Sequence, residues 1–400
     1  MMTAVLTRIF GPSNLDLIQD VVQDALVKAL EQWPYTGVPR SPGAWLVQAA
    51  KHRAIDLLRR RTLLADKAEQ LLREWEPSEP PPDDGLGPPA FADDLLSMLF
   101  MCCHPAIPRE GRVALALRTV AGLSVGEIAR AFLAEEATVA QRIVRAKRQI
   151  RDQGIAFALP APGDLPARLG SVLEVLYLWF NEGYLARAGA DLVRRDLCEE
   201  AIRLVTLLTR HPPTDQPATH ALLALLLFQA ARFPARIDSE GDLLLLREQD
   251  RARWDRRLIH RGFRHLGRSA EGEEASRYHL EAGIAACHAA AASYADTDWA
   301  QIVDLYDQLH RQHPTPVVAL NRAVALSRLH GPEAGLRALE PLRESPALAR
   351  YALLPAVLAE LWAEAGAPER AAALYRQALR GPCSEPERRY LQRRLARVAG

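Results

Sequence analysis

Apolar residues recur at intervals of three and four along most of this chain, which is the spacing of one face of an α-helix. Near the beginning this spacing links Leu15, Ile18, Val22, Leu26 and Leu30, and acidic residues fall between them at Asp16, Asp20, Asp24 and Glu31. We expect an amphipathic helix there with an acidic exposed side. Alternation of the β-strand type is not sustained, and Asn-Gly hairpin turns are absent. The pattern predicts an all-α protein.

Two proline-rich stretches divide the helical sequence. Residues 75–90 contain six prolines and four acidic residues, a composition that neither packs nor continues a helix and that predicts a stiff linker. Residues 158–166 form a shorter break of the same kind. We therefore expect three helical units, at residues 1–74, 91–157 and 167–400.

The third unit contains two similar segments. Gly331-Pro332-Glu333 and Gly366-Ala367-Pro368-Glu369 begin 35 residues apart, and each is followed by apolar residues at helical spacing. A helix-turn-helix repeat of the tetratricopeptide kind has a period of about 34 residues. The stretch from 167 to 300 shows no comparable period, so coincidence in an alanine-rich sequence is the alternative.

Composition narrows the classes of protein that fit. Of 400 residues 25% are charged and 49% hydrophobic, which indicates a globular chain with several domains. No stretch resembles the run of about 18 uncharged apolar residues that a membrane span needs, and the N-terminus lacks the basic segment of a signal peptide. We expect a cytoplasmic protein with no membrane contact. Five cysteines without regular spacing predict reduced, packed thiols.

The net charge of +1 gives the whole molecule no long-range attraction to nucleic acid, so any such binding must come from local clusters. One cluster lies in a predicted pair of helices. Ser124 can cap the first helix with Glu127 completing a capping box, and Ile128 and Phe132 supply its buried side. The second helix is expected to start near Ala137.

The second helix of this pair separates apolar from basic residues. Its apolar side is predicted to contain Val139, Ile143 and Ala146, and the remaining side contains Thr138, Gln141, Arg142, Arg145 and Arg148. From Thr138 to Arg151 there are five positive side chains and no acid. A helix of this kind enters the major groove, and we expect Gln141 and Arg142 to read bases there. A solvated basic helix in an ordinary bundle is the alternative.

A second basic cluster follows an aromatic residue and a predicted kinked loop from Pro34 to Pro42. Trp45 is followed by the basic residues Lys51, His52, Arg53, Arg59, Arg60 and Arg61. Aromatic rings beside arginines suit single-stranded nucleic acid, because an unpaired base stacks on a ring while guanidinium groups hold the backbone. Equally, Trp45 could be core and the arginines a helix terminus favoured by the helix dipole.

Together these motifs resemble a known family. The segments are Asp20 to Leu26, Trp45-Leu46 with Asp56 and Arg59-Arg60, and the helix-turn-helix from Leu123 to Ala146. In this order, the first 155 or so residues resemble a bacterial sigma factor of the extracytoplasmic-function group. Region 2 would then occupy residues 1–74, and region 4 would occupy residues 91–157 after the linker.

The resemblance implies partners and roles. Asp20, Gln23 and Asp24 would bind the clamp of core RNA polymerase. The flap of core polymerase would be a second site of contact. The downstream (-10) promoter element would be held, with a base taken out of the stack, by Trp45, His52, Arg53, Arg59 and Arg60. The upstream (-35) element would be read as duplex by Thr138, Gln141, Arg142, Arg145 and Arg148.

The remainder resembles the large helical extension of sigma factors with a tetratricopeptide-like tail. The segments that carry this likeness are Leu176–Tyr184, Arg195–Leu204, Asp250–Asp255, Ala295–Trp299 and Leu320–Ala325. It implies that the chain's own C-terminal domain acts as an intramolecular regulator of its activity. The chain departs from the family in three places: the first domain is about one helix short, His52 stands where Asn is usual, and Leu133-Ala134 stands where the turn usually has Gly.

Other classes of protein fit less well. Met101-Cys102-Cys103-His104 is a tempting zinc cluster, but adjacent cysteines on a helix do not turn toward one ion and no Cys-x-x-Cys partner exists, so we expect core residues there. Without a phosphate-binding loop or nucleophile motif, we expect neither an enzyme nor a cofactor. The alternatives are a helix-turn-helix repressor or activator that acts without polymerase, and a scaffold whose tail is the working part.

Overall fold

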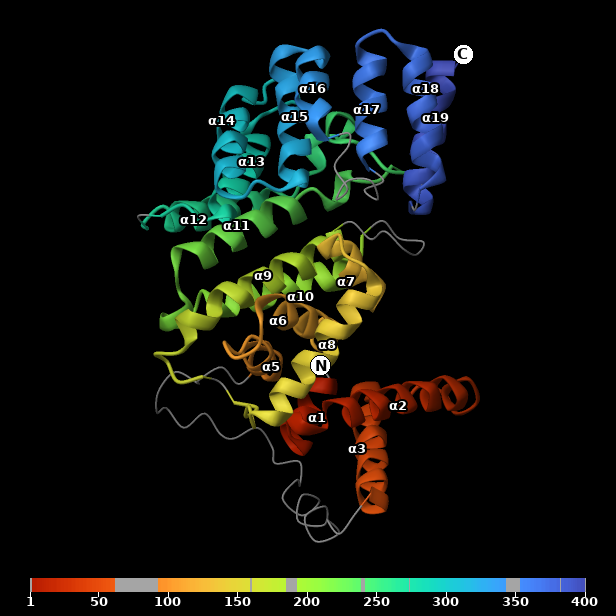
Figure 1. Ribbon diagram of the computed structural model, residues 1–400, viewed down its shortest axis with the longest axis vertical. Coiled ribbons are helices and arrows are strands. Elements are labelled where there is room, and N and C mark those ends of the chain that lie inside the picture. Colours follow the sequence, from red (N-terminus) through yellow and green to blue (C-terminus); the bar gives the residue numbers. More distant parts are fainter. Residues whose placement is uncertain are drawn as a thin grey trace. The chain divides into compact units, whose positions relative to one another are not determined.

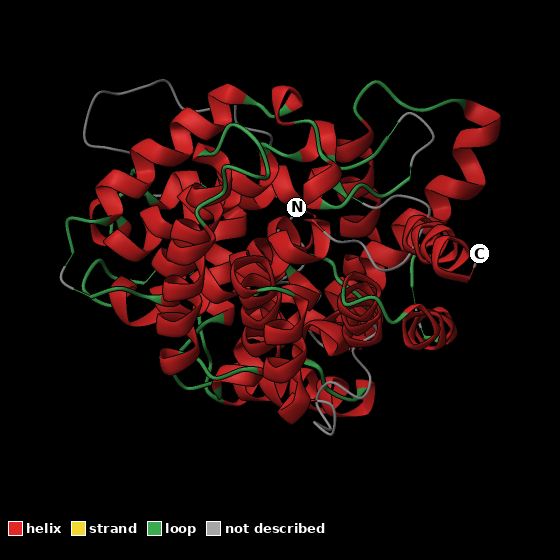
Figure 2. Ribbon diagram, turned by 90° about the horizontal axis from the view of Figure 1, so that it is seen from above, coloured by secondary structure: helices red, strands yellow, loops and turns green. Residues whose placement is uncertain are grey.

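The computed structural model describes residues 2–61, 93–158, 160–184, 193–238, 242–272, 274–342, 353–381 and 383–399, without the side chains of 59–61. The predicted linker at 75–90 lies outside these residues. Every regular element that is described is helical, and one isolated bridge joins Ile237 to Leu243 (Figure 2). The all-α class is therefore confirmed. The chain forms two compact units, Met1–Arg130 with Ala134–Val175, and Ala131–Leu133 with Leu176–Gly400.

The first unit begins with three helices, α1 (Met2–Phe10), α2 (Leu15–Thr36) and α3 (Pro42–Arg61), and a short 3₁₀ turn, η1 (Pro12–Asn14), between α1 and α2 (Figure 1). They share a core to which all three contribute, made of Leu6, Phe10, Leu17, Ile18, Val21, Ala25, Ala50, Ala54 and Ile55. Burial of this apolar surface is what holds the short helices together.

The buried face of α2 differs from the predicted one. Leu15 and Ile18 are buried as expected, but Leu26 is 43% exposed and Leu30 is 76% exposed. The buried face continues through Val21, Ala25 and Ala29 instead. The prediction was wrong because it favoured large residues, whereas α3 packs against the small ones, where two helices can approach closely.

The predicted loop from Pro34 to Pro42 is also shorter than expected. Helix α2 includes Pro34 and ends at Thr36, and Gly37 follows with a φ of +80°. Proline removes one hydrogen bond but lies in the last turn, where little helix remains to be disrupted. The ring of Trp33 packs edge-on against Trp45 with centroids 5.5 Å apart, which ties the end of α2 to the start of α3.

The rest of the first unit contains α5 (Asp94–Cys102), α6 (Arg109–Thr119), α7 (Val125–Phe132) and α8 (Glu136–Asp152). Asp93 caps α5 by accepting from the N–H groups of Leu95 and Leu96. Cys102 and Cys103 are fully buried, and burial raises the pKa of Cys102 to about 12 and that of Cys103 well above its usual value. The interpretation of these thiols as core residues is confirmed.

Helix α9 (Leu165–Tyr184) belongs to both units, since the first unit ends at Val175. Its first half packs on α5 and α6: Arg112 donates to Ser171 at 3.2 Å, Arg168 to the carbonyl of Phe100 at 3.2 Å, and Arg109 pairs with Glu174 at 2.8 Å. Those first turns therefore belong to the first unit.

The second unit continues as a series of helices in which most neighbours in sequence pack on one another (Figure 1). They are α10 (Arg195–Leu208), α11 (Pro217–Ala230), α12 (Arg256–Ser269), α13 (Arg277–Ala290), α14 (Trp299–Gln312), α15 (Pro316–His330), α16 (Pro332–Leu339), α17 (Leu353–Glu364), α18 (Pro368–Arg380) and α19 (Glu385–Ala399).

Helix α11 corrects one statement made from sequence. The stretch Pro217–Ala235 is long and apolar enough to cross a membrane, although we expected no such stretch; among the described residues it is the one that passes this test. It is 78% buried inside the protein. It is apolar on all sides because α10, α12 and α13 pack around it.

The two similar segments near the C-terminus have the same local structure. Gly331 and Gly366 both have left-handed backbone, with φ of +89° and +75°, and each ends the first helix of an α-helical pair. Pro332 and Pro368 then begin α16 and α18 at the first helical position, where a missing N–H costs nothing. The similarity in sequence therefore corresponds to equivalent turns, between α15 and α16 and between α17 and α18.

Candidate nucleic-acid and polymerase interface

Helices α7 and α8 form the predicted helix-turn-helix. Ser124 donates its backbone N–H to Glu127 at 2.6 Å and accepts from the N–H of Glu127 at 3.2 Å, which is the expected capping box. The turn contains Leu133 with a φ of +51°, the left-handed conformation that favours glycine. This explains why leucine is a departure at that position.

The apolar side of α8 is buried as the spacing predicted. Val139, Ile143 and Ala146 are buried, and Ile150 extends the same face by one more turn. Gly111 of α6 lies against this face. A Cβ added to this glycine would lie 3.6 Å from the Cβ of Ala146. Because α6 covers one side of α8, the opposite side is available to solvent.

That opposite side contains a polar stripe. Thr138, Gln141, Arg145 and Arg148 are all exposed. Their spacing of three, four and three residues places them on one face of the helix. Arg148 pairs with Asp152 at 3.2 Å, whereas Arg145 has no partner among the described residues. We call these four residues the α8 stripe.

Two other basic side chains of α8 are engaged within the protein. Arg142 forms an ion pair with Glu110 of α6 and is 27% exposed. Lys147 donates to Asp16 at 2.7 Å and to Gln19 at 2.6 Å, both on α2. Arg142 therefore stays a predicted base reader whose guanidinium must first leave Glu110, and Lys147 is not part of the stripe.

The predicted residues of α3 have mixed environments. Trp45 is half-buried against Trp33, while His52 is exposed and lies 3.0 Å from the Nε2 of Gln48. Arg53 is exposed and pairs with Asp24 of α2 at 2.9 Å. Arg59 and Arg60 belong to the helix, but their side chains lie outside the described part of the chain. One basic residue in this cluster, Lys51, is buried, and burial lowers its pKa.

Helix α2 presents both polar and apolar groups to solvent. Asp20, Gln23 and Asp24 are exposed, as binding to a partner requires. Beside them lie Leu26, Val27 and Leu30, exposed by 43%, 54% and 76%. We call these three residues the α2 apolar patch. The sequence analysis missed this patch because it assigned Leu26 and Leu30 to the core. The presence of apolar residues on more than one face of α2 could have revealed it.

Comparison with known proteins finds a matching protein family for each of the two helical parts of the first unit. Residues 2–63, which cover α1 to α3, match Sigma-70 region 2, and residues 97–150, which cover the helix-turn-helix, match Sigma-70 region 4. These two regions, in this order, support a sigma-70 family sigma factor with a role in promoter recognition and transcription initiation, and they imply binding to core RNA polymerase and promoter DNA.

The extension of this sigma factor has relatives of unknown role. Residues 168–270 match a family of unknown function, DUF6596. An uncharacterized protein of Rhizobium meliloti (strain 1021) is 45% identical over 332 residues, which is 83% of this chain and 78% of the relative. No solved structure matches the chain.

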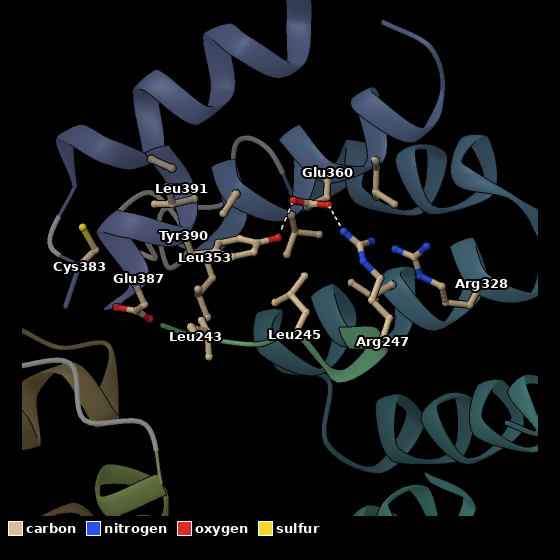
Figure 3. Close-up of a pocket in the computed structure, with 15 residues that line it drawn as sticks. Leu243, Leu245, Arg247, Arg328, Leu353, Glu360, Cys383, Glu387, Tyr390 and Leu391 are labelled. Atoms are coloured by element: carbon tan, nitrogen blue, oxygen red, sulfur yellow. Dashed lines mark hydrogen bonds and ion pairs between the residues drawn. The ribbon is translucent and has the colours of Figure 1, made fainter. Parts of the chain in front are cut away.

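The second unit contains a cavity of about 260 Å³ beside a network of charged groups (Figure 3). At its centre Glu360 accepts from Arg394 at 2.7 Å, Tyr375 at 2.6 Å and Tyr390 at 2.7 Å, and pairs with Arg247 at 2.8 Å. Burial raises the pKa of Glu360, but these donors outweigh burial and lower it to about 2. The network joins α17, α18 and α19 to the segment that carries Arg247.

Proposed function

We propose that this sigma factor belongs to the extracytoplasmic-function group and works in the cytoplasm, with its own tetratricopeptide-like C-terminal unit tuning its activity. The observation that carries its DNA-reading role is the α8 stripe, a polar and basic stripe beside the exposed Val144 on a helix whose other face is anchored in the core. A recognition helix needs this division, since one side must be rigid while the other enters the major groove.

Docking on polymerase is assigned to α2. Asp20 and Gln23 supply acceptors for basic groups on the clamp, as does Asp24 once it leaves Arg53, and such charged contacts mainly set orientation and association rate. The α2 apolar patch supplies area whose burial favours the complex by roughly 25 cal/mol per Å². Affinity therefore comes mainly from Leu26, Val27 and Leu30, and specificity from the acidic residues beside them. Region 4 would meet the flap.

Promoter contact is divided between two helices. The α8 stripe reads the upstream (-35) element as duplex, where polar side chains reach base edges and arginines reach guanine or phosphate. Helix α3, with Trp45, His52, Arg53, Arg59 and Arg60, holds an unstacked base of the downstream (-10) element, at a cost of a few kcal/mol that polymerase contacts must offset.

A repressor or activator that acts without polymerase is not favoured. Such a protein needs the helix-turn-helix but has no use for region 2, which residues 2–63 match in addition. Neither sigma region is catalytic, so we assign the chain no enzymatic activity and no cofactor.

The test is reconstitution with purified core polymerase. The full chain should co-elute with core polymerase and, as holoenzyme, select promoters from a randomised DNA library and initiate transcripts at defined positions. Core polymerase alone is the control. If the chain binds selected duplexes equally well with and without polymerase and forms no complex with it, the repressor interpretation replaces ours.

A further inference from the structure

A second cavity, of about 340 Å³, lies within the second unit. It is enclosed by the end of α9 and by α11, α13, α14 and α15, and every residue that lines it is described. Three of the segments that characterise this extension meet there: Leu176–Tyr184 contributes Tyr177 and Asn181, residues 250–255 contribute Trp254, and Leu320–Ala325 contributes Asn321.

The wall of this cavity combines rings with amides. The aromatic residues that line it are Tyr177, Phe180, Tyr184, Phe228, Trp254 and Tyr306. Three amides also line it: Asn181, which bonds to Tyr177, Gln229, and Asn321, whose side chain has no partner among the described residues. The exposed wall is therefore a mixture of polar groups and rings, and its volume falls within the 300–1,000 Å³ that small-molecule sites usually have.

One side of the cavity is positively charged. Arg232 lines it and donates only to the amide oxygens of Gln229 at 3.1 Å and Gln249 at 3.3 Å. Its guanidinium lies 5.7 Å from the ring centre of Trp254. Within the described chain Arg232 forms no ion pair, so its charge is not neutralised by any carboxylate.

A second arginine, Arg251, does not line the cavity but lies 5.0 Å from the ring centre of Trp254, which does. Arg251 is buried and donates to the carbonyls of His288 and Ala291 at 2.7 and 2.8 Å, again without an ion pair in the part of the chain described. Burial, together with Arg232 and Arg251, lowers the pKa of His288 to about 3, so this histidine is neutral. The cavity's other arginine, Arg277, is neutralised by Glu281 at 3.0 Å.

Arg232 is half-buried, lines the cavity and has no counter-ion among the described residues, so an anion in the cavity would meet a positive charge that is not already neutralised. We propose that the cavity binds a small metabolite that carries an anionic oxygen group, a carboxylate or a phosphate, on an aromatic body. The anion lies against Arg232, the ring lies among the aromatic side chains, and Asn321 donates to or accepts from a polar substituent. This inference does not depend on how the extension affects transcription, because binding is measured on the chain itself.

The cavity of Figure 3 offers no comparable site. Its arginines, Arg247 and Arg328, already pair with Glu360 and Glu364 at 2.8 to 2.9 Å, so no charge is left for a ligand. The contrast identifies the unpaired Arg232, rather than cavity size, as the feature that predicts an anion.

The experiment measures binding of three probes to the full chain by calorimetry, with melting temperature as a second readout. The probes are 4-hydroxybenzoate, phenyl phosphate and the uncharged 4-hydroxybenzamide, at one ionic strength. We expect at least one anion to bind at least tenfold more tightly than the amide, because a charge-assisted hydrogen bond is worth about that factor. The tighter of the two anions identifies carboxylate or phosphate as the group recognised.

Variants locate the site. Arg232→Gln should weaken binding of that anion at least tenfold, while Arg311→Gln, which removes an exposed arginine outside the cavity, should leave it unchanged. Asn321→Ala, which leaves the charge of Arg232 in place, should also weaken binding and provides a second test. Absence of binding by both anions at millimolar concentration, or equal binding by the parent and both cavity variants, would overturn the proposal.

Discussion

Arg145 differs from the other basic side chains of α8, because within the described residues it is the one whose charge is not engaged. Arg142 pairs with Glu110, Lys147 with Asp16, and both Arg148 and Arg151 with Asp152. An arginine that is already free binds DNA without first losing an internal ion pair. At the scale of single residues, the strength of internal pairing therefore ranks the candidate base readers.

The first prediction follows from this ranking. Arg145→Ala should weaken binding of holoenzyme to a duplex upstream element by about 1–3 kcal/mol, as expected for a base-contacting arginine, and Arg142→Ala by less. Fluorescence anisotropy at fixed salt measures both. Arg311→Ala, which removes an exposed arginine of α14 far in sequence from the stripe, is the control. Equal affinities of the Arg145 variant and the control would remove Arg145 from the interface.

The turn of the helix-turn-helix supplies a second prediction. Leu133 has a left-handed backbone, which costs an L-residue roughly 1–2 kcal/mol, and β-branching increases that cost. Leu133→Val should therefore lower the free energy of unfolding by about 1 kcal/mol or more, whereas Leu133→Gly should change it less, since relief of strain offsets lost burial and backbone entropy. Chemical denaturation measures the free energy of unfolding of both variants and of the parent chain. A Leu133→Val variant more stable than Leu133→Gly would contradict the prediction.

At the scale of elements, α2 packs one face into the core and exposes apolar residues on another. Its core face consists of residues such as Val21, Ala25 and Ala29, while Leu26, Val27 and Leu30 remain on the outside. Large apolar side chains left in water next to acidic ones are the composition of an interaction surface rather than of a core.

The third prediction concerns this patch. Leu30→Ser should leave the melting temperature nearly unchanged, because the side chain is 76% exposed, but should weaken binding to core polymerase about tenfold through loss of buried apolar area. Leu329→Ser, at a partly exposed leucine of α15, is the control. Surface-immobilised core polymerase measures the affinity. If Leu30→Ser binds core polymerase as tightly as the parent chain does, the docking surface lies elsewhere.

The packing of α17, α18 and α19 depends on an ionised carboxylate. Because the pKa of Glu360 is lowered from 4.5 to about 2, its contribution to stability is present above pH 4.5 and is lost as the pH falls toward 2. The contribution is on the order of 3 kcal/mol at neutral pH. Glu360→Gln should therefore destabilise the chain at pH 7 and much less at pH 3. Denaturant titrations at both pH values test this, and an equal difference at the two would contradict it.

At the scale of the whole molecule, the boundary between the two units lies inside α9. The break at residues 158–166 suggested that the extension begins at residue 167, but α9 from Leu165 to Val175 belongs to the first unit and contacts α6. A cut before α9 would remove the partners of Arg109 and Arg112 in the first unit. A test of the extension must therefore keep α9 complete.

The final prediction uses such a truncation. A chain ending at Tyr184 should retain the helical signal and cooperative melting of the first unit, yet initiate transcription at a rate different from the full chain. Comparison of run-off transcripts at equal holoenzyme concentration measures this. The full chain with Arg311→Gln serves as a control for purification and handling. Identical transcript levels would show that the extension does not tune activity.

Local signals predicted much of the fold and of the interface. The capping box of Ser124 and Glu127 and the buried side of α8 follow from neighbours within four residues, and both are confirmed. Pro34 was misjudged because a proline in the last turn does little to disrupt the helix, and the face of α2 because it depends on what packs against the helix. Arg142 was ranked as a base reader because Glu110, its partner, is distant in sequence.

The sequence by itself determined that the chain is helical, where its proline-rich breaks lie, and which helix separates apolar from basic residues, because helix spacing and capping are set by residues within one or two turns. Only the tertiary structure decided which face of α2 is buried, which arginines are neutralised, and that segments from residue 177 to 321 enclose one cavity. Those outcomes depend on contacts between residues far apart in the chain, and local spacing contains no information about them.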